Sequence, residues 1–389
     1  MTPRKKDYGK LALALHKKLG GKIALTAKAP LKTRDDWSVS YTPGVAAVST
    51  HVAKHPHDAK LMTVKKNSVA VVSDGSAVLG LGNIGPLGAL PVMEGKAVIF
   101  KEVAGIDAYP IVLDTQDPEK VIETVVNIAP GFGGINLEDI KAPECFYIEE
   151  EVKKRLAIPV MHDDQHGTAI VVLAALMNAL KVVKKKKEAV SVTVLGAGAA
   201  GYAIAMLLKL DGFTDIRVSD SKGVVHRART DLNPYKKKLA ALPSKRKDAH
   251  TLSGAVAGSD VLIAVSGPGT VSKDMVASMA DKAIVFALAN PVPEIMPETA
   301  KAAGAAVVAT GRSDFPNQVN NALVFPGVFR GALDADVSKI TDDMKLRAAY
   351  ALARLVKMPT ADHVIPSVMD KKVMPAVARA VAKKHRREY

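Results

Sequence analysis

The segment 190–220 constrains the fold more than any other part of the chain. An apolar run at 190–195 is followed by the sequence GAGAAG at 196–201, an apolar helix expected at 202–210, and a strand at 216–218. In such a unit the first glycine permits a tight turn, the second lets the backbone approach a pyrophosphate, and the third lets helix and strand pack closely. We therefore predict a dinucleotide site on a parallel sheet, formed by Gly196, Gly198, Ala199, Ala200 and Gly201.

The second strand of this unit leads to Asp220, which bears on the choice of dinucleotide. A carboxylate at this point accepts hydrogen bonds from the ribose hydroxyls of NAD and repels the 2′-phosphate of NADP. The next residues, Ser221-Lys222-Gly223 with Arg227 and Arg229 nearby, could turn a cation toward that phosphate. The sequence predicts that NAD is preferred and that NADP is used measurably.

Apolar strands alternate with helical stretches along the 389 residues, a length that accommodates two domains. We expect strands at 69–72, 97–100, 111–113, 190–195, 216–218, 261–265, 284–287 and 306–309, and helices at 118–128, 168–183, 344–355 and 373–384. The predicted fold class is α/β. We expect an N-terminal α/β substrate and metal domain (1–165), a Rossmann-type doubly wound parallel-sheet domain that binds NAD(P) (166–333), and C-terminal helices packing back on the core (334–389).

The N-terminal stretch 8–30 is rich in helix-forming residues and contains a Gly20-Gly21 stop, so we expect a helix or a helical arm there. The apolar residues at 11–19 and the arm up to Trp37 would expose much apolar surface on a lone monomer. We therefore expect a homodimer or a higher dimer-based oligomer.

Two acidic segments, GINLEDI at 134–140 and IPVMHDDQHGT at 158–168, each follow a buried-strand composition. Acids in turns are often merely solvated, but these lie at strand-to-helix junctions, where α/β proteins form clefts. Carboxylate oxygens suit Mg²⁺ or Mn²⁺, whereas His162 and His166 could ligate a softer ion such as zinc. The oxygen-rich setting favours Mg²⁺ or Mn²⁺.

Composition excludes several other classes of protein. The net charge of +15 raises nucleic-acid binding as an alternative, but the lysine runs are scattered and aromatic residues make up only 4%. These features argue against nucleic-acid binding as the main role. One cysteine, Cys145, excludes an internal disulfide and fits a cytoplasmic protein. We expect no signal peptide and no membrane span, because no apolar run reaches about 18 residues.

A second glycine motif, GLGNIG at 80–85, is a weaker candidate for nucleotide binding. Pro86 and Pro91 should interrupt the helix that ought to follow, and no acid is well placed at a strand end. We interpret this segment as a glycine-rich turn whose backbone lines a substrate cleft.

In chain order, a set of segments resembles motifs of the malic enzyme family: SYTPGVA at 40–46, SDGSAVLGLGNIG at 73–85, PVMEGK at 91–96, the two acidic segments, ANP at 289–291 and GRSDFPNQVNN at 311–321. The resemblance covers residues 10 to 385 and is closest to the short, single-module type of bacteria and archaea. It implies NAD(P)-dependent oxidation and decarboxylation of (S)-malate to pyruvate and CO₂ with Mg²⁺ or Mn²⁺, and decarboxylation of oxaloacetate as a further activity.

The resemblance also implies roles for single residues. Metal ligands would be Glu138, Asp139 and Asp164, and the catalytic residues Lys96 as base, Tyr41 as acid and Asp163 as support. We expect a lowered pKa for Lys96 beside the metal, and we place Lys96 at the start of the strand expected at 97–100.

Substrate contacts would come from Ser76, Lys96, Asn290 and Asn321, with Asn320 as a further candidate. Asn290 would also contact the nicotinamide ribose. The arginine that longer relatives carry after the Asp-Gly of the glycine-rich motif is absent here, where Ser76-Ala77 stands. Arg312 and backbone amides near Ser76 are both candidates to neutralise that malate carboxylate. Two alternatives remain open: a malolactic enzyme that retains NAD and forms lactate, and a non-catalytic nucleotide- or nucleic-acid-binding descendant.

Overall fold

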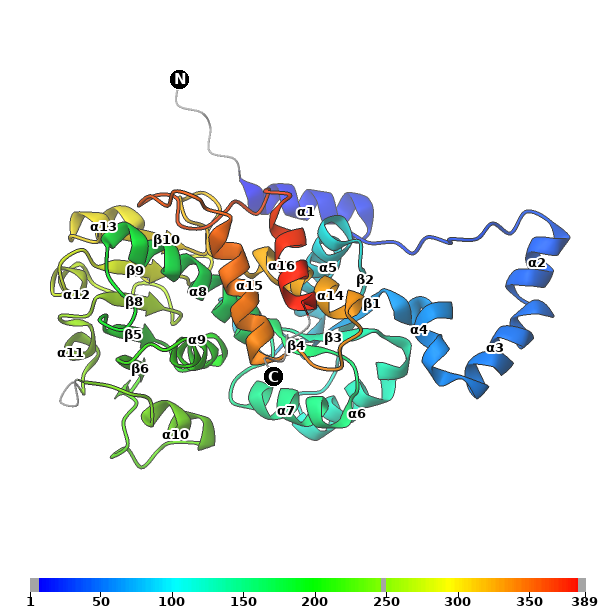
Figure 1. Cartoon of the computed structure of the whole chain (residues 1–389), viewed down its shortest axis with the longest axis horizontal. Coiled ribbons are helices and arrows are strands. Elements are labelled where there is room, and N and C mark those ends of the chain that lie inside the picture. Colours follow the sequence, from blue (N-terminus) through cyan, green and yellow to red (C-terminus); the bar gives the residue numbers. More distant parts are fainter. Residues whose placement is uncertain (1–6, 246–249, 384–389) are drawn as a thin grey trace, which may run out of the picture.

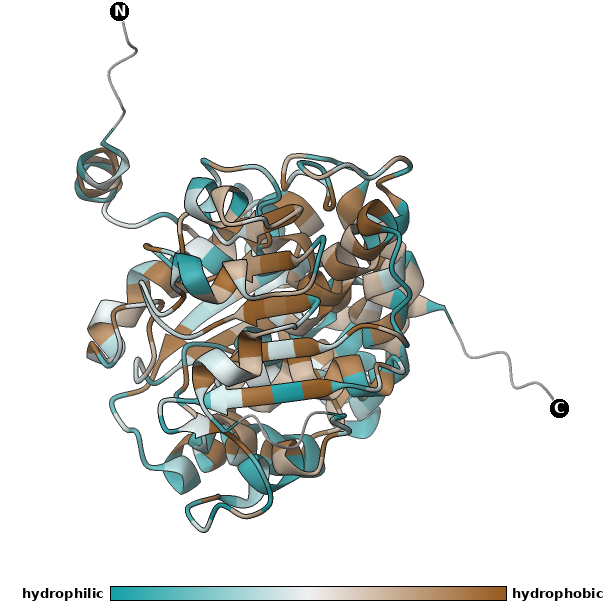
Figure 2. Ribbon diagram, turned by 90° about the vertical axis from the view of Figure 1, so that its left-hand side faces the viewer, coloured by the Kyte–Doolittle hydropathy of each residue, from teal (hydrophilic) through white to brown (hydrophobic). Residues whose placement is uncertain are grey.

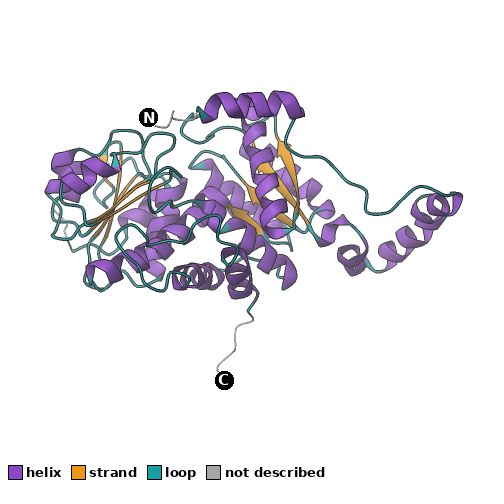
Figure 3. Cartoon of the chain, turned by 90° about the horizontal axis from the view of Figure 1, so that it is seen from above, coloured by secondary structure: helices purple, strands orange, loops and turns teal. Residues whose placement is uncertain are grey.

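The computed structural model describes residues 7–245 and 250–383, and its strands form two separate sheets (Figures 1 and 3). The first is four-stranded, in the order β2-β1-β3-β4. Its strands are β1 (Ser68–Ser73), β2 (Asp107–Val112), β3 (Gly134–Leu137) and β4 (Val160–His162). All of them pair in parallel. The chain runs outward from β1 in both directions, so the strand order reverses between β1 and β3.

The second sheet is six-stranded, in the order β10-β9-β8-β5-β6-β7. Its strands are β5 (Val192–Leu195), β6 (Ile216–Asp220), β7 (Gly223–Val224), β8 (Val261–Ala264), β9 (Ile284–Ala287) and β10 (Val307–Thr310). Only the short edge strand β7 is antiparallel. Figure 2 shows these strands as mostly hydrophobic bands, as expected for a parallel sheet covered on both faces. The predicted α/β fold with a Rossmann-type sheet is confirmed.

Helix α8 (Asp163–Val183) connects the two sheets and forms the centre of the molecule (Figure 1). It starts five residues earlier than the helix expected at 168–183, so its first turn includes Asp163 and Asp164. By length and hydropathy it could cross a membrane, but 72% of its apolar window is buried. A single hydrophobic cluster joins α8 to β1 and to β5, which identifies α8 as a core helix of a globular protein.

The expected strand at 97–100 is wrong, because these residues belong to helix α5 (Gly85–Ala104). Its buried residues recur at helical spacing: Ala89, Met93, Lys96, Ala97, Phe100 and Ala104. Pro86 lies in the first turn, where its missing N–H costs nothing, and Pro91 lies inside the helix. The expectation that these prolines interrupt a helix after the second glycine motif was therefore also wrong.

The N-terminal helices are α1 (Tyr8–Leu19), α2 (Arg34–Ser40) and α3 (Gly44–Lys54), and none of them buries a residue. The first ends at Gly20, as predicted. Figures 1 and 3 show α2 and α3 projecting away from both sheets on an extended arm. The exposed residues include Leu13 at 75%, Val39 at 74% and Trp37 at 55%.

The other helices flank the sheets and close the core. They are α4 (Ala59–Met62), α6 (Pro118–Ile128), α7 (Glu144–Arg155), α9 (Ala199–Leu210), α10 (Pro234–Ala240), α11 (Leu252–Val256), α12 (Lys273–Ala277), α13 (Pro297–Ala302), α14 (Phe325–Asp334), α15 (Asp342–Arg354) and α16 (Val373–Ala382). Single 3₁₀ turns lie at Pro56–Asp58 (η1), Val64–Lys66 (η2), Ala129–Gly131 (η3) and Asn321–Leu323 (η4). The helices α14–α16 lie in the middle of the molecule (Figure 1), and residues of all three belong to the hydrophobic cluster that contains α8. The helix expected at 373–384 is α16, which ends at Ala382, and Lys384 lies outside the described residues.

Candidate active site

The register of the first sheet brings the two acidic segments to one point. Val72 of β1 lies opposite Leu137 of β3, and Leu137 lies opposite His162 of β4. The residues that follow, including Glu138 and Asp163, therefore leave the sheet side by side at its carboxyl edge. This edge is also where the strand order reverses, the usual place for a ligand site in an open α/β sheet.

Lys96 reaches this point from α5 and is buried, with only 7% of its surface exposed. Its Nζ donates a hydrogen bond to Asp163 Oδ2 and lies 2.7 Å from Glu138 Oε2. The Nζ also lies 4.3 Å from the ring centre of Phe325, at the start of α14. The Lys96 amine is thus enclosed by its own helix α5, by both acidic segments and by the start of α14.

The protein's own groups act on the Lys96 amine in the direction opposite to the predicted lowering of its pKa. Burial lowers the pKa, but the carboxylates of Asp163, Glu138 and Asp164 outweigh burial and raise it above the usual lysine value. The predicted lowering depended on the positive charge of a bound metal ion.

Glu138, Asp139 and Asp164 each place a carboxylate oxygen within 4.8 Å of the others. The Asp139 backbone N–H donates to Asp164 Oδ2 over 2.8 Å, which ties the second acid of the first segment to α8. Burial and the neighbouring Asp164 raise the pKa of Asp139 to about 7 and the pKa of Glu138 well above its usual value.

The cluster of Glu138, Asp139 and Asp164 fits a hard divalent cation, because one of its buried oxygens lacks a partner in the described part of the chain and its acids repel one another. Asp139 Oδ2 is a buried acceptor without a hydrogen-bond partner among the described residues, and Asp139 adopts a left-handed φ of 53°. A cation would supply the missing partner and offset the repulsion between the acids. His162 is fully buried behind Asp164, and His166 turns to Glu149 instead, so neither histidine completes a soft-metal site.

The glycine-rich loop after β1 folds over the acidic cluster. Gly75 has φ +68°, and a Cβ there would lie 2.2 Å from the backbone of Gly85, so only glycine fits. Next to it, the Ser76 hydroxyl donates to Asp74 Oδ1 over 2.6 Å and accepts from the Lys141 backbone N–H over 2.9 Å. Ser76 thus lies in the loop that closes on Asp139, to which the Ala77 backbone N–H also donates over 2.9 Å.

The predicted substrate contacts Asn290 and Asn321 approach two different elements, the glycine-rich loop and α8 respectively. A Cβ atom placed on Gly80 would lie 2.0 Å from the Asn290 carbonyl oxygen, so these two residues are close neighbours. A Cβ atom placed on Gly167 would lie 3.2 Å from Asn321 Cβ, which shows the same for that pair. Asn290 therefore lies where the loop after β9 meets the glycine-rich loop. Asn321 lies beside the first turn of α8.

Two other predicted polar contacts already have partners within the chain. Arg312 donates to both carboxylate oxygens of Asp314 and to the Pro291 carbonyl oxygen. Asn320 uses its side-chain oxygen to cap the turn at Ala322. Arg312 would have to share its charge to bind a substrate carboxylate.

Tyr41 is not brought to the acidic cluster by its own chain. It ends α2 on the projecting arm and is 67% exposed, and Figure 1 shows this arm well away from β3 and β4. The predicted catalytic residues therefore divide into a buried group, Lys96 and Asp163, and one exposed tyrosine.

A second site lies at the carboxyl end of β5, where the strand order of the six-stranded sheet reverses. A Cβ at Gly196 would lie 2.5 Å from the Val265 carbonyl oxygen, and one at Gly201 would lie 1.8 Å from the Gly196 carbonyl oxygen. A Cβ at Gly198 would meet nothing within 4 Å, so that position faces open space at the start of α9. The loop has the tight turn, the close packing and the open cradle that a pyrophosphate requires.

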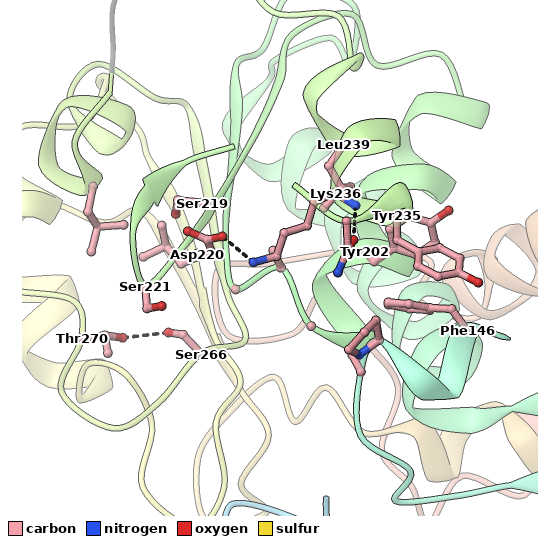
Figure 4. Close-up of a pocket in the computed structure, with 18 residues that line it drawn as sticks. Phe146, Tyr202, Ser219, Asp220, Ser221, Tyr235, Lys236, Leu239, Ser266 and Thr270 are labelled. Carbon is pink, nitrogen blue, oxygen red and sulfur yellow. Dashed lines mark hydrogen bonds and ion pairs between the residues drawn. The ribbon is translucent and has the colours of Figure 1, made fainter. Parts of the chain in front are cut away.

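This loop opens into a pocket of about 420 Å³, drawn in Figure 4. Its wall includes Asp220, which receives hydrogen bonds from Arg229 (2.8 and 3.0 Å) and from Lys236 (2.6 Å). Burial raises the pKa of Asp220, but these cations and the Lys222 backbone N–H lower it to about 2. The carboxylate is ionised and already paired with two cations.

Several residues in or beside the two sites were not anticipated from the sequence. Lys236 belongs to one of the scattered lysine runs, and no role was predicted for it. The Asn233 side chain caps α10 by accepting the Lys236 backbone N–H, and Lys236 Nζ donates to Asp220. Phe146, Tyr202 and Tyr235 form an aromatic cluster in the pocket wall, with ring centres 4.6 to 5.8 Å apart (Figure 4). They come from three distant segments, so no local pattern signals the cluster.

Comparison with known proteins matches the two parts of the chain, one with each sheet, to two domain families. Residues 20–120 match the family described as malic enzyme, N-terminal domain, and residues 165–386 match malic enzyme, NAD binding domain. The chain belongs to the malic enzyme family. The expectation of an NAD(P)-dependent enzyme of this family is thereby confirmed, and so is the resemblance on which it rested.

Individual relatives match over nearly the whole chain. An NAD-dependent malic enzyme from Geobacillus stearothermophilus is 54% identical over 365 residues, covering 93% of this chain and 76% of the relative. A bifunctional malic/malolactic enzyme from Bacillus subtilis is 52% identical over 375 residues, covering 96% and 92%. The crystal structure of an NAD-dependent malic enzyme from Thermotoga maritima matches with a TM-score of 0.92 at 48% identity, covering 95% of this chain and 98% of that one.

Proposed function

We propose that the protein oxidises and decarboxylates (S)-malate to pyruvate and CO₂, with reduction of NAD⁺ or NADP⁺ and dependence on Mg²⁺ or Mn²⁺. The observation that carries the proposal is the buried Lys96 amine, held by Asp163 and Glu138 at the edge of the first sheet. A reaction that removes a hydroxyl proton beside a metal-binding carboxylate cluster needs a base placed in this way. We also propose oxaloacetate decarboxylation as a partial reaction of the same site.

We propose Glu138, Asp139 and Asp164 as the metal ligands, because their oxygens already converge within 4.8 Å. When bound, the cation supplies Lewis-acid polarisation of the substrate oxygen. The charge of the bound cation would offset the charges of Glu138 and Asp164 and favour the neutral form of Lys96, which would accept the hydroxyl proton at Nζ. Asp163, hydrogen-bonded to that nitrogen, would orient it. Asn321 beside the first turn of α8, and Ser76 and Asn290 near the glycine-rich loop, would bind and orient the substrate.

We propose that Tyr41 acts as the acid that protonates the product carbon, and that it does so in the active site of a second copy of this chain. Its own arm buries no residue in α1, α2 or α3 and exposes apolar side chains along its length. A homodimer in which each arm covers its partner would bury that surface and bring a tyrosine to each acidic cluster.

We infer that NAD⁺ is the preferred cofactor, with measurable use of NADP⁺. Asp220 at the end of β6 supports NAD⁺, because its carboxylate is ionised and would repel a 2′-phosphate. Arg229 and Lys236 favour NADP⁺, because they neutralise the Asp220 carboxylate and so reduce its repulsion of the 2′-phosphate. The ratio of kcat/KM for the two cofactors tests the preference, and Lys236→Ala should lower the value for NADP⁺ more than the value for NAD⁺.

We further propose a cytoplasmic enzyme with domain boundaries near residues 165 and 333. The first lies just inside α8 and the second at the end of α14. Several lysines of the basic runs are paired within the chain: Lys185 with Asp260, Lys187 with Asp211, Lys236 with Asp220 and Lys238 with Glu150. This pairing supports a small-molecule enzyme over a nucleic-acid-binding descendant.

A steady-state assay with malate, Mn²⁺ and each nicotinamide cofactor tests the proposed reaction. We expect pyruvate and free reduced cofactor to form in equal amounts, and both to stop after removal of the metal. A folded, metal-loaded protein that forms neither product would overturn the assignment.

Malolactic chemistry is the second candidate, and the name of the Bacillus subtilis relative, bifunctional malic/malolactic enzyme, favours testing it. Lactate formed without net release of reduced cofactor would indicate that reaction. Product analysis of the same assay separates the two, because lactate and pyruvate are quantified independently.

A further inference from the structure

Glu149, on α7, is a buried carboxylate outside the groups used above, with 4% of its surface exposed. Its Oε1 accepts a hydrogen bond from the His162 backbone N–H over 2.9 Å and lies 2.6 Å from Lys153 Nζ. Its Oε2 accepts from His166 Nε2 over 2.9 Å and from Gln165 Nε2 over 3.4 Å. Both oxygens are therefore engaged, three times by the segment 162–166.

The engaged segment is the start of α8. His162 is the residue before the first helical position, and Asp163 and Asp164 follow it directly. The two contacts of Glu149 to the backbone of His162 and the side chain of His166 span the first turn from one end to the other. A single carboxylate on a neighbouring helix thus holds the turn from which Asp163 and Asp164 project.

Glu149 is ionised, so both of its oxygens can accept hydrogen bonds from the first turn of α8. Burial raises the pKa of Glu149, but the hydrogen bond from His166 and the positive charge of Lys153 outweigh burial and hold that pKa well below the usual glutamate value. Burial also lowers the pKa of His166 to about 4, so the ring is neutral near pH 7. An ionised carboxylate only accepts, so the neutral ring donates through Nε2–H, and Lys153 provides the balancing charge.

The position of Asp164 depends on this turn. Its Oδ2 accepts the Asp139 backbone N–H over 2.8 Å, and His162 Nε2 lies 3.5 Å from the same oxygen. A shift of the turn would therefore move Asp164 relative to both Asp139 and the buried His162. It would also move Asp163, the partner of Lys96. Groups that orient metal ligands from behind commonly change metal affinity by about 10- to 100-fold when they are removed.

We propose that Glu149 is a positioning residue that sets the affinity of the carboxylate cluster for its divalent cation by fixing the first turn of α8. The inference rests on the proposed metal site formed by Glu138, Asp139 and Asp164. Glu149 touches neither the proposed cation nor the substrate; it acts through His162 and His166.

The test is the dissociation constant of Mn²⁺ from the full-length protein without substrate, measured from the electron paramagnetic resonance signal of free Mn²⁺. We expect Glu149→Ala to raise this constant by about 10- to 100-fold. Glu149→Gln should raise it less, because the amide oxygen can still accept the His162 N–H. At saturating Mn²⁺ the variants should recover most of kcat, since Lys96 and the proposed ligands remain.

Asp211→Asn is the matched control for losing a buried carboxylate. Asp211, 8% exposed at the end of α9, accepts from Tyr350 Oη over 2.5 Å and pairs with Lys187 over 3.0 Å, so these partners lie outside α7 and the first turn of α8. We expect this variant to lose thermal stability without a change in the Mn²⁺ constant. Binding of NADH, followed by fluorescence, reports that each variant retains its folded nucleotide site.

His166→Leu tests the route through the helix turn. It should raise the Mn²⁺ constant by itself, and the double variant with Glu149→Ala should be little worse than Glu149→Ala alone, because both act on one contact. A Mn²⁺ constant within about twofold of wild type in folded Glu149→Ala overturns the proposal. If that variant does not fold, the same result in Glu149→Gln overturns it. Failure of the wild-type protein to bind Mn²⁺ would instead reject the proposed metal site itself.

Discussion

The cluster around Lys96 and the arm that carries Tyr41 contrast sharply within one chain. Lys96, Glu138 and Asp163 are buried, and the Lys96 amine contacts both carboxylates, which come from the ends of two adjacent strands. Tyr41 is 67% exposed on helices that bury no residue. The fold of a single chain is enough to assemble the cluster around Lys96. The arm that carries Tyr41 would need the surface of a second copy to pack against.

The physical difference lies in what holds each region in place. The cluster is fixed by parallel strand register and by opposite charges at low solvent access, which make a displaced carboxylate or amine costly. The arm has no such constraint, since its apolar side chains face solvent in the isolated chain. Loss of one group in the cluster should therefore remove activity in each subunit separately, whereas defects in the arm should be shared between subunits.

The largest expected effect comes from breaking the cluster at its amine. Lys96→Ala should lower kcat for malate oxidation by about 10²- to 10⁴-fold, because no other described lysine contacts Glu138 or Asp163. Lys101→Ala, on the same helix but exposed and paired with Asp107, is the control and should keep normal activity. Steady-state kinetics with each purified variant gives the comparison, and normal kcat in Lys96→Ala would remove Lys96 from the mechanism.

Metal removal tests the acidic side of the same cluster. Treatment with EDTA and dialysis should abolish turnover, and Mn²⁺ should restore it and raise Tm, because a ligand that binds only the folded state stabilises it. Asp164→Asn should weaken Mn²⁺ binding, whereas Asp362→Asn, exposed and paired with Lys301, should not. Activity that survives exhaustive chelation would contradict the metal requirement.

Complementation between subunits tests the arm. A mixture of Tyr41→Phe and Lys96→Ala, each inactive in the full reaction, should recover about a quarter of wild-type activity after subunit exchange, since half of the dimers are mixed and each has one complete site. If Tyr41 served its own chain, no mixed dimer would contain a complete site and no activity would return. Sedimentation at micromolar concentration should show the dimer; a monomer would contradict the arrangement.

Tyr41→Phe alone separates the steps of the reaction. It should impair protonation of enolpyruvate more than decarboxylation of oxaloacetate, because a phenylalanine cannot donate a proton while the buried cluster is unchanged. Pyruvate tautomerisation and oxaloacetate decarboxylation are measured independently. Full tautomerisation activity in the variant would remove the general-acid role from Tyr41.

The smallest expected effect concerns Asp220, a charge cluster that is also complete within one chain. Its pKa of about 2 lies below the unfolded value, so the pairing with Arg229 and Lys236 stabilises the protein above about pH 4 and loses this effect as pH falls toward 2. Asp220→Asn should be less stable by about 1 kcal/mol or less at pH 7, since solvent screens the network. Urea unfolding at pH 7 and near pH 3 measures the difference, which should shrink at the lower pH.

The sequence alone was sufficient for the parts of the protein that depend on local pattern. The loop at Gly196, the strands on either side and Asp220 follow one another within one βαβ unit, so turn chemistry and periodicity were enough to place them. The acidic segments were likewise found at strand ends, since parallel strands meet their ligands at the carboxyl edge. The strand at 97–100 was wrong because a short apolar run is equally compatible with a buried helix face.

Tertiary structure decided which of these residues meet. Strand register and α5 bring Lys96 to Glu138 and Asp163, although 67 residues separate Lys96 from Asp163. In the sequence Glu149 is one of three consecutive glutamates, and only its contacts with His162 and His166 connect it to the turn that bears Asp164. Contacts across such distances depend on how whole elements pack, and no local spacing encodes them. The exposure of Tyr41 has the same origin, since the surface that would cover it is not supplied by the packing of its own chain.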